Sequence, residues 1–302
     1  MTTERRGVAA GTSATPYLLV ALAGLCWSGN HVLGRAIAGH VPPFAISTIR
    51  WAVPAVLLLP FALPHLRRDW PLIRAHWRII LFLAITGTAI FGVLQYVGLQ
   101  YTTAINMGVL NSMGPVLIAV AGAVLFRDRL GWLQMLGIAI SLAGVLGIVT
   151  KGEPATLATL SFNTGDLIIL FNMAMWGIYS ACYRVRPSIH WLSFTFLLAI
   201  ISTVTTLPFF VAEHLSGQTL QPTLMTAGAL AYASLFPTLV AMLCWNRGVE
   251  LIGSNRAGAM MHLIAFYGAV LSSWLLGERL ETYHFAGFAL ILAGVWLAAR
   301  KA

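Results

Sequence analysis

Long apolar segments separated by short polar breaks run along the whole chain, and they constrain its fold more than any other feature. A membrane-spanning helix needs about 20 predominantly apolar residues. Apolar periodicity and the polar breaks predict ten such spans. They lie at residues 17–38, 43–63, 78–99, 103–125, 131–150, 164–184, 190–212, 224–246, 254–276 and 282–299.

Composition agrees with a membrane protein. The 302 residues are 59% hydrophobic and 9% charged, with mean hydropathy +0.83, whereas soluble domains are about 25% charged. There is too little charge to solvate a globular surface, so the predicted fold class is an all-α polytopic membrane protein with no large soluble domain. The first span is too long for a signal-peptide core and lacks a following cleavage site, so we expect it to be retained.

The basic residues indicate an orientation. Net charge is +9, but Lys and Arg are scattered singly or in pairs, unlike the basic face of a nucleic-acid-binding protein. With the N-terminus in the cytoplasm, 14 of the 18 Lys and Arg residues lie inside, and only Lys151 and Arg279 fall in outside loops. This asymmetry predicts two cytoplasmic termini. Arg35 and Arg50 lie within helices near the outer boundary, and we expect them to snorkel or pack helices rather than bind substrate.

The chain repeats itself at an offset of 150 residues. Residues 98–145 align without gaps to 248–295 with thirteen identities, LFRDRL at 125–130 meets LLGERL at 275–280, and LAGV ends both segments. Near an offset of 149, Trp27 meets Trp176. The sequence therefore predicts two five-helix repeats, 1–150 and 151–302, and because five is odd the second is inverted. Inverted repeats are typical of secondary transporters with a midplane site, although a duplication can also serve only to build a stable bundle.

These features together resemble a known family. The ten spans, the LLGERL segment with its LFRDRL partner and the closing LAGV resemble the EamA branch of the drug/metabolite transporter superfamily, most of all the YddG-type amino-acid exporters. The resemblance implies a location in the bacterial inner membrane. It also implies a central cavity lined mainly by spans 1, 3, 4, 6, 8 and 9, with spans 5 and 10 peripheral. The superfamily carries amino acids, other metabolites, nucleotide sugars, sugar phosphates and drugs.

Polar and aromatic residues inside the spans are the candidate substrate-binding residues, because a polar side chain in hydrocarbon usually faces the bundle or a watery cavity. Helical spacing places several of them on one face of the first span and several on one face of the sixth. Hydrogen bonding between helices is the alternative role for each. The candidates are Trp27, Asn30, His31, Gln95, Tyr96, Asn111, Ser112, Asn172, Trp176, Tyr179, His262 and Tyr267.

The lack of Lys, Asp and Glu in the middle of the spans narrows the class of substrate that we expect the cavity to bind. No Lys lies in mid-membrane, which disfavours phosphate recognition, and no Asp or Glu occupies the middle of a span, which disfavours lipophilic cations. We therefore expect a nearly neutral cavity of amides, hydroxyls, imidazoles and aromatic rings. That chemistry suits a zwitterion, since aromatic faces contact cations and amides and helix ends bind charged termini. The predicted function is amino-acid export by alternating access; the alternative is export of another small neutral metabolite or drug.

Other classes of function lack their motifs. There is no Walker A pattern, so ATP-driven transport would need another subunit, and neither GxSG nor HExxH occurs. We expect no enzyme activity, no catalytic residues, no cofactor and no metal site; Cys26, Cys182 and Cys244 are predicted core residues. An intramembrane enzyme and a receptor are the alternatives.

His31 and His262 are the intramembrane groups that titrate near neutral pH, so proton exchange and facilitated diffusion both stay open. The expected partners are a small-molecule substrate and the bilayer, but no nucleic acid, and the expected state is a monomer or weak homodimer.

Overall fold

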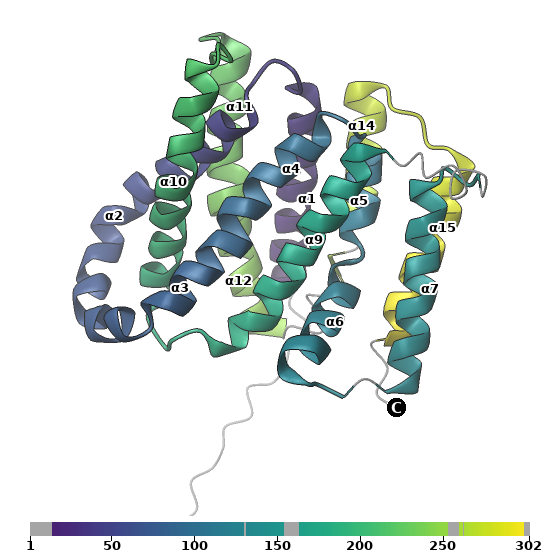
Figure 1. Ribbon diagram of the computed structural model, residues 1–302, viewed down its shortest axis with the longest axis horizontal. Helices are drawn as coiled ribbons and strands as arrows, with labels where there is room; N and C mark the ends of the chain where they lie inside the picture. The colour runs from purple at the N-terminus through teal and green to yellow at the C-terminus, as the bar shows by residue number, and fades with distance from the viewer. Residues whose placement is uncertain (1–13, 130, 154–162, 253–259, 262, 299–302) are drawn as a thin grey trace, which may run out of the picture.

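The computed structural model describes residues 14–129, 131–153, 163–252, 260–261 and 263–298. Within these ranges the chain is helical and contains no strand, as the sequence predicts. The helices stand roughly side by side in one bundle (Figure 1). They are α1 (Thr15–Ala36), α2 (Pro43–Ala75), α3 (Trp77–Ala84), η1 (Ile85–Ile90), α4 (Phe91–Leu99), α5 (Ala104–Asn111), α6 (Gly114–Phe126), α7 (Trp132–Val149), α9 (Thr164–Cys182), η2 (Tyr183–Val185), α10 (Trp191–Leu215), α11 (Leu224–Leu235), η3 (Phe236–Val240), α12 (Ala241–Ile252), α14 (Leu263–Leu276) and α15 (Thr282–Ala298).

Six described helical segments are long and apolar enough to cross a membrane. The α5–α6 pair makes a seventh if its 49° bend lies within one span. The helices α7, α14 and α15 are shorter apolar helices. Ten spans and the inversion of the repeats therefore stay predictions. The six segments are Thr15–Ala36, Pro43–Ala75, Trp77–Leu99, Thr164–Val185, Trp191–Leu215 and Leu224–Trp245.

Carboxylates from distant helices satisfy several helix N-termini, where backbone N–H groups lack intrahelical partners. Glu213, near the end of α10, accepts hydrogen bonds from the first amides of α2. Glu278, between α14 and α15, accepts from Ala104 N and Ile105 N at the start of α5. Asp69 near the end of α2 accepts from His190 N, just before α10. These contacts fix the long helices against one another at their ends.

Two helices, α7 and α15, lie beside each other at one edge of the bundle, with the remaining helices on their other side (Figure 1). Glycines bring their backbones together. A Cβ on Gly144 would lie 2.6 Å from Gly287 O, and a Cβ on Gly294 would collide with Gly137 O. An offset of 150 carries Gly144 onto Gly294 and Gly137 onto Gly287. The two contacts are thus equivalent under the sequence repeat, as in a two-fold contact.

Candidate functional site

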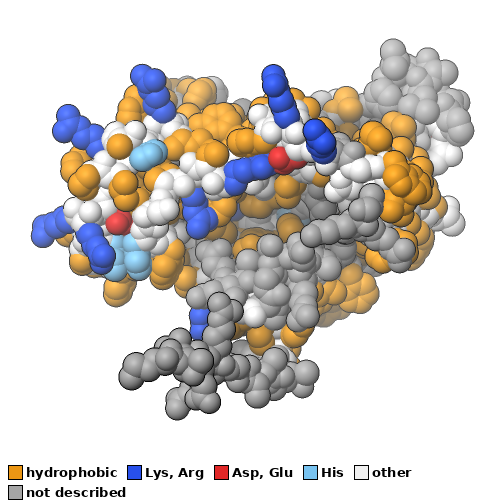
Figure 2. Space-filling model, turned by 90° about the horizontal axis from the view of Figure 1, so that it is seen from below, with side chains coloured by type: hydrophobic (Ala, Val, Ile, Leu, Met, Phe, Trp, Pro, Cys, Tyr) orange, Lys and Arg blue, Asp and Glu red, His pale blue; other side chains and the backbone are white. Residues whose placement is uncertain are grey.

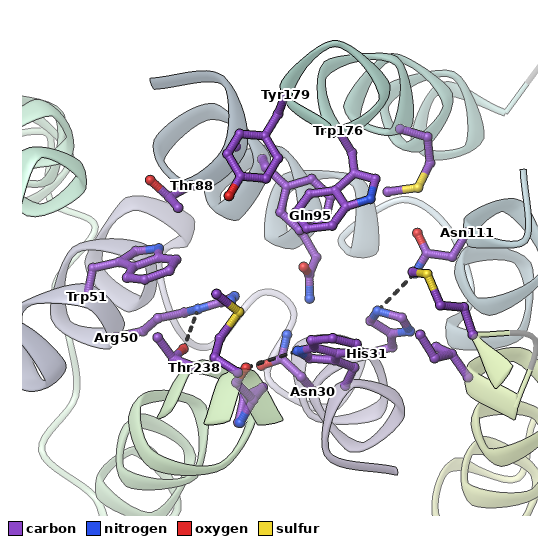
Figure 3. Close-up of a pocket in the computed structure, with 18 residues that line it drawn as sticks. Asn30, His31, Arg50, Trp51, Thr88, Gln95, Asn111, Trp176, Tyr179 and Thr238 are labelled. Atoms are coloured by element: carbon purple, nitrogen blue, oxygen red, sulfur yellow. Dashed lines mark hydrogen bonds between the residues drawn. The ribbon is translucent and has the colours of Figure 1, made fainter. Parts of the chain in front are cut away.

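A buried cavity of about 100 Å³ lies among α1, α2, the η1 region, α9 and the η3 region (Figure 3). Both halves of the chain contribute side chains to it. Ordinary ligand pockets measure about 300–1,000 Å³, so this cavity has to widen before it can hold a solute of amino-acid size. Its lining comprises Trp27, Asn30, His31, Arg50, Trp51, Gly87, Thr88, Phe91, Gln95, Asn111, Met173, Trp176, Tyr179, Pro237, Thr238, Met242, Met261 and Ile264.

The polar face of α1 is tied to three other helices. Trp27 Nε1 donates to Pro237 O at 3.0 Å. Asn30 Oδ1 accepts from Tyr96 OH at 2.8 Å, and His31 Nε2 lies 3.1 Å from Asn111 Nδ2. Asn30 and His31 are themselves buried, with 2% and 4% of their surface exposed. These bonds hold the side chains in fixed orientations beside the cavity.

An aromatic wall faces them from α9 and α4. The Trp176 ring lies 4.9 Å from the Phe91 ring and 5.2 Å from the Tyr179 ring, measured between centroids. All three rings line the cavity. Tilted ring pairs at this spacing are favourable, so the wall is an apolar, π-rich surface with a defined shape.

Two short π-helical segments, η1 and η3, interrupt the helices that pass the cavity. Thr88 Oγ1 in η1 donates to Ala84 O at 2.5 Å, and Thr238 Oγ1 in η3 donates to Ala233 O at 2.8 Å. An offset of 150 carries Thr88 onto Thr238, and both line the cavity. π-Helical turns occur frequently at functional sites because they re-aim side chains. The two halves thus place the same local distortion at the same cavity.

Of the two roles expected for Arg50, snorkelling or helix packing, the structure shows helix packing. Its side chain lies inside the bundle with 6% of its surface exposed and lines the cavity. Arg50 Nε donates to Thr238 Oγ1 at 3.0 Å and Nη1 donates to Tyr96 OH at 3.3 Å. The cavity is therefore not neutral, because none of its described lining residues is Asp or Glu. Arg35 also packs helices: its Nη1 donates to Leu99 O and Gln100 O.

Four buried polar atoms on lining residues have no partner within the described part of the chain. They are His31 Nδ1, Trp51 Nε1, Gln95 Nε2 and Asn111 Oδ1. Buried polar groups almost always have hydrogen-bond partners. In this conformation these four atoms keep unused hydrogen-bonding capacity beside the cavity.

The structure gathers seven of the twelve candidate residues around this cavity: Trp27, Asn30, His31, Gln95, Asn111, Trp176 and Tyr179. Tyr96 lies behind the lining and orients Asn30 and Arg50 through its hydroxyl. Ser112 and Asn172 are buried but do not line the cavity.

Tyr267 packs near Gly24 and Phe266, also away from the cavity. His262 lies outside the described residues. Besides Arg50, the candidate residues did not include Trp51, Thr88 and Thr238, which also line the cavity. The 150-residue offset pairs the two threonines and could have pointed to them.

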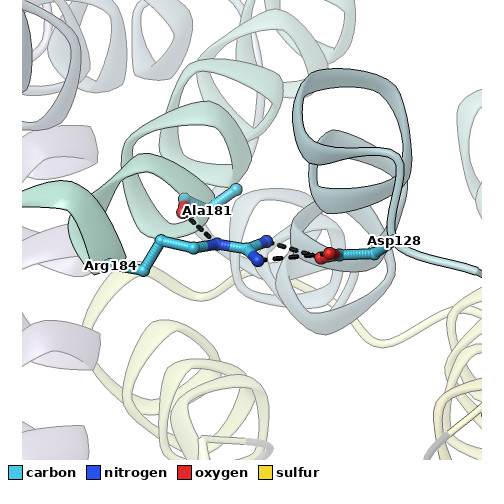
Figure 4. Close-up of polar contacts among 3 residues, drawn as sticks. All are labelled: Asp128, Ala181 and Arg184. Carbon is cyan, nitrogen blue, oxygen red and sulfur yellow. Dashed lines mark hydrogen bonds and ion pairs between the residues drawn. The ribbon is translucent and has the colours of Figure 1, made fainter.

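An ion pair joins the segments that follow α6 and α9, at the end of the bundle where α2, α6 and α9 finish (Figure 4). Arg184 Nη2 lies 2.5 Å from Asp128 Oδ2 and Nη1 lies 3.2 Å from Oδ1, while Nε donates to Ala181 O. Hydrogen bonds from Arg184 lower the pKa of the Asp128 carboxyl, so it stays ionised at neutral pH. A second, more open pocket at the opposite end is lined in part by Arg35 and Glu278.

A model of the EamA-like transporter family matches the chain twice, over residues 14–150 and 163–300. The chain belongs to the EamA-like transporter family. As a member it is a multi-pass membrane transporter, part of the drug/metabolite transporter superfamily. The two matches leave out residues 1–13, 151–162 and 301–302, so the family covers nearly the whole chain.

Relatives of this EamA-family transporter span it almost completely. The uncharacterized transporter YetK of Bacillus subtilis (strain 168) is 25% identical over 287 residues, covering 94% of this chain and 87% of YetK. An uncharacterized transporter of Archaeoglobus fulgidus is 24% identical over 289 residues, covering 94% of this chain and 97% of its own. A protein crystal structure matches with TM-score 0.59 at 19% identity, covering 95% and 96% of the two chains, and shows the shared fold.

Proposed function

We propose that this transporter exports amino acids, aromatic and other neutral ones in particular, across the bacterial inner membrane by alternating access. The lining of the central cavity carries the proposal. Trp176, Tyr179 and Phe91 form an apolar, π-rich wall, and the amides of Asn30, Gln95 and Asn111 face the same space. Such a site can hold an apolar side chain, while its polar groups bind the ammonium and carboxylate.

Inverted repeats fit this mechanism, because two similar halves of opposite topology give two states of comparable energy around a central site. Three observations support them. The family model matches each half separately, Thr88 and Thr238 occupy equivalent π-helical segments, and α7 meets α15 through equivalent glycine contacts. We therefore propose that residues 1–150 and 151–302 are the two repeats.

The distribution of arginine supports an orientation with both termini in the cytoplasm. We call the end of the bundle where α2, α6 and α9 finish the basic end. Figure 2 looks onto this end and shows arginine side chains spread over it. By the positive-inside rule this end faces the cytoplasm. Its exposed arginines include Arg67, Arg68, Arg74, Arg78, Arg127, Arg129, Arg184 and Arg186.

Flux through purified protein in liposomes tests the proposal. We expect labelled phenylalanine, tyrosine, leucine and other neutral amino acids to cross faster than in protein-free liposomes, and to compete with one another. Lipophilic dyes and neutral sugars serve as the comparison panel. Folded protein that moves a dye or a sugar but no amino acid would contradict the assignment of amino acids as the substrate. The protein would still be a transporter.

A further inference from the structure

Arg50 places a permanent positive charge in the central cavity. A guanidinium carries five N–H donors, and Thr238 and Tyr96 accept hydrogen bonds from two of its nitrogens. The guanidinium carbon also lies 5.6 Å from the Trp51 ring and 5.7 Å from the Tyr96 ring. Neutral groups thus hold the side chain in position, and no described residue accepts from its remaining donors.

No acidic side chain balances this charge within the described lining. Glu213 lies on the neighbouring α10 but bonds Phe44 N and Ala45 N at the start of α2. A buried cation without a counter-ion is costly. The cavity is therefore electrostatically complementary to an anion, and it supplies only one arginine, whereas phosphate recognition needs clustered basic residues.

We propose that Arg50 binds the carboxylate of the transported solute and makes a carboxylate a requirement for transport. The inference rests on the proposed amino-acid transport and names its recognition element. Figure 3 shows Arg50 and Thr238 on one side of the cavity and Trp176 on another, with Gln95 between them. A solute whose carboxylate meets Arg50 can therefore lay an apolar side chain against the Trp176 wall.

Arg50→Gln and Arg50→Lys test this requirement in liposomes. For wild type, phenylalanine and 3-phenylpropionate should compete with labelled phenylalanine, and phenylalanine amide should compete on the order of 10- to 100-fold more weakly. Arg50→Gln should raise the KM for phenylalanine by a similar factor and remove the discrimination between acid and amide. Arg50→Lys, which keeps the charge but not the planar fork, should retain part of both.

Arg74→Gln is the matched control, because Arg74 is an exposed arginine in the last turn of the same helix. It should keep the wild-type KM and discrimination. Thermal melting with and without phenylalanine reports folding and binding together. Phenylalanine should raise the melting temperature of wild type and Arg74→Gln but not of Arg50→Gln.

Unchanged discrimination in folded Arg50→Gln would overturn the role of Arg50 while leaving amino-acid transport intact. Arg50-dependent flux of 3-phenylpropionate without flux of any amino acid would support Arg50 as the carboxylate-binding residue. The same result would contradict amino acids as the transported solutes.

The ion pair at the basic end carries a second, independent inference. An offset of 150 aligns Asp128 with Glu278, and the offset of 149 that aligns Trp27 with Trp176 also aligns Arg35 with Arg184. The repeat therefore places the same acid–base pair at both ends of the bundle. At the basic end the pair is formed, with both side chains 45% exposed. Half-exposed pairs contribute little stability, so this one can open and close readily.

At the opposite end the equivalent residues face one pocket but bond to other groups. Glu278 binds Ala104 N and Ile105 N, whereas Arg35 binds Leu99 O and Gln100 O. Because inverted repeats exchange their conformations between the two states, we infer that Arg35–Glu278 forms when Asp128–Arg184 breaks. The two pairs then alternate, one at each end of the bundle. This inference rests on the proposed inverted repeats and is independent of the solute.

Cross-linking with a bifunctional thiol reagent whose spacer is about as long as an arginine side chain tests the alternation in a background with Cys26, Cys182 and Cys244 replaced by alanine. Asp128→Cys with Arg184→Cys, and Arg35→Cys with Glu278→Cys, should each cross-link with this reagent. With all four cysteines present, any one molecule should carry one cross-link or the other, as read by mass spectrometry of its fragments. Arg35→Cys with Asp128→Cys, at opposite ends, should not cross-link within a chain. Failure of the 35–278 cross-link, or both cross-links in one molecule, would overturn the inference.

Discussion

Gly144→Ala is expected to lower the free energy of unfolding by about 1–3 kcal/mol, the usual cost of overpacking. The new methyl group would lie 2.6 Å from Gly287 O, so α7 and α15 would have to separate. Gly294→Ala should cost a similar amount, because its methyl group meets the equivalent backbone on α7. Thermal unfolding in detergent, followed by intrinsic fluorescence, should show both variants melting several degrees below wild type.

Gly147→Ala is the matched control for this contact. Gly147 lies on the same helix, and a Cβ there would meet nothing within 4 Å. Alanine is the better helix former by roughly 1 kcal/mol, so this variant should melt at or above the wild-type temperature. Wild-type melting of Gly144→Ala would contradict the close approach of the two helices. A large cost at Gly144 with none at Gly294 would contradict the equivalence of the two contacts.

Trp176→Ala is expected to raise the KM for an aromatic amino acid about tenfold, since aromatic contacts of this kind contribute about 0.5–1.5 kcal/mol beyond their buried area. The substitution removes the centre of the wall that also includes Phe91 and Tyr179. Initial rates of uptake into liposomes at several concentrations measure the KM.

Trp274→Ala removes a ring of the same size from the outside of α14, where 80% of the Trp274 surface is exposed. It should leave the KM unchanged. Equal KM values for Trp176→Ala and wild type, with folded protein in both, would remove the aromatic wall from the substrate site.

Helix positions follow closely from sequence where an apolar run is long. The runs predicted at 17–38 and 164–184 correspond to α1 at Thr15–Ala36 and to the segment Thr164–Val185. Helix α2 instead continues to Ala75, far beyond the apolar run at 43–63. Hydropathy predicts only the apolar part of a helix, which lies in the lipid. The helix itself extends as far as its backbone hydrogen bonds continue.

The candidate site was only partly predictable. Asn30, Trp176 and similar residues stand out because polar or aromatic side chains inside apolar runs are conspicuous. Arg50 was not predicted as a cavity residue, because its distance from the end of the span does not tell whether its side of the helix faces the bundle or the lipid. The direction in which it faces depends on Tyr96 and Thr238, which lie 46 and 188 positions away in the chain. Contacts between residues so distant in sequence are fixed by tertiary packing.

The proposed alternating access accounts for the small size of the central cavity. At about 100 Å³ it is too small to hold a solute of amino-acid size without a change in helix packing. The ion pair between Asp128 and Arg184 connects the ends of α6 and α9 on one side, but at 45% exposure it contributes little stability. In the proposed mechanism the carrier binds solute on one face, rearranges and releases it on the other, so a site that returns loaded exchanges one solute for another.

Counterflow measures this exchange directly. Liposomes containing the purified transporter are loaded with unlabelled phenylalanine at high concentration and diluted into a trace of labelled phenylalanine. The expected result is transient accumulation of label above its equilibrium level, because outward movement of unlabelled solute returns the site for inward movement of label. Label that equilibrates without an overshoot, or that fails to enter liposomes containing folded protein, would contradict an alternating amino-acid carrier.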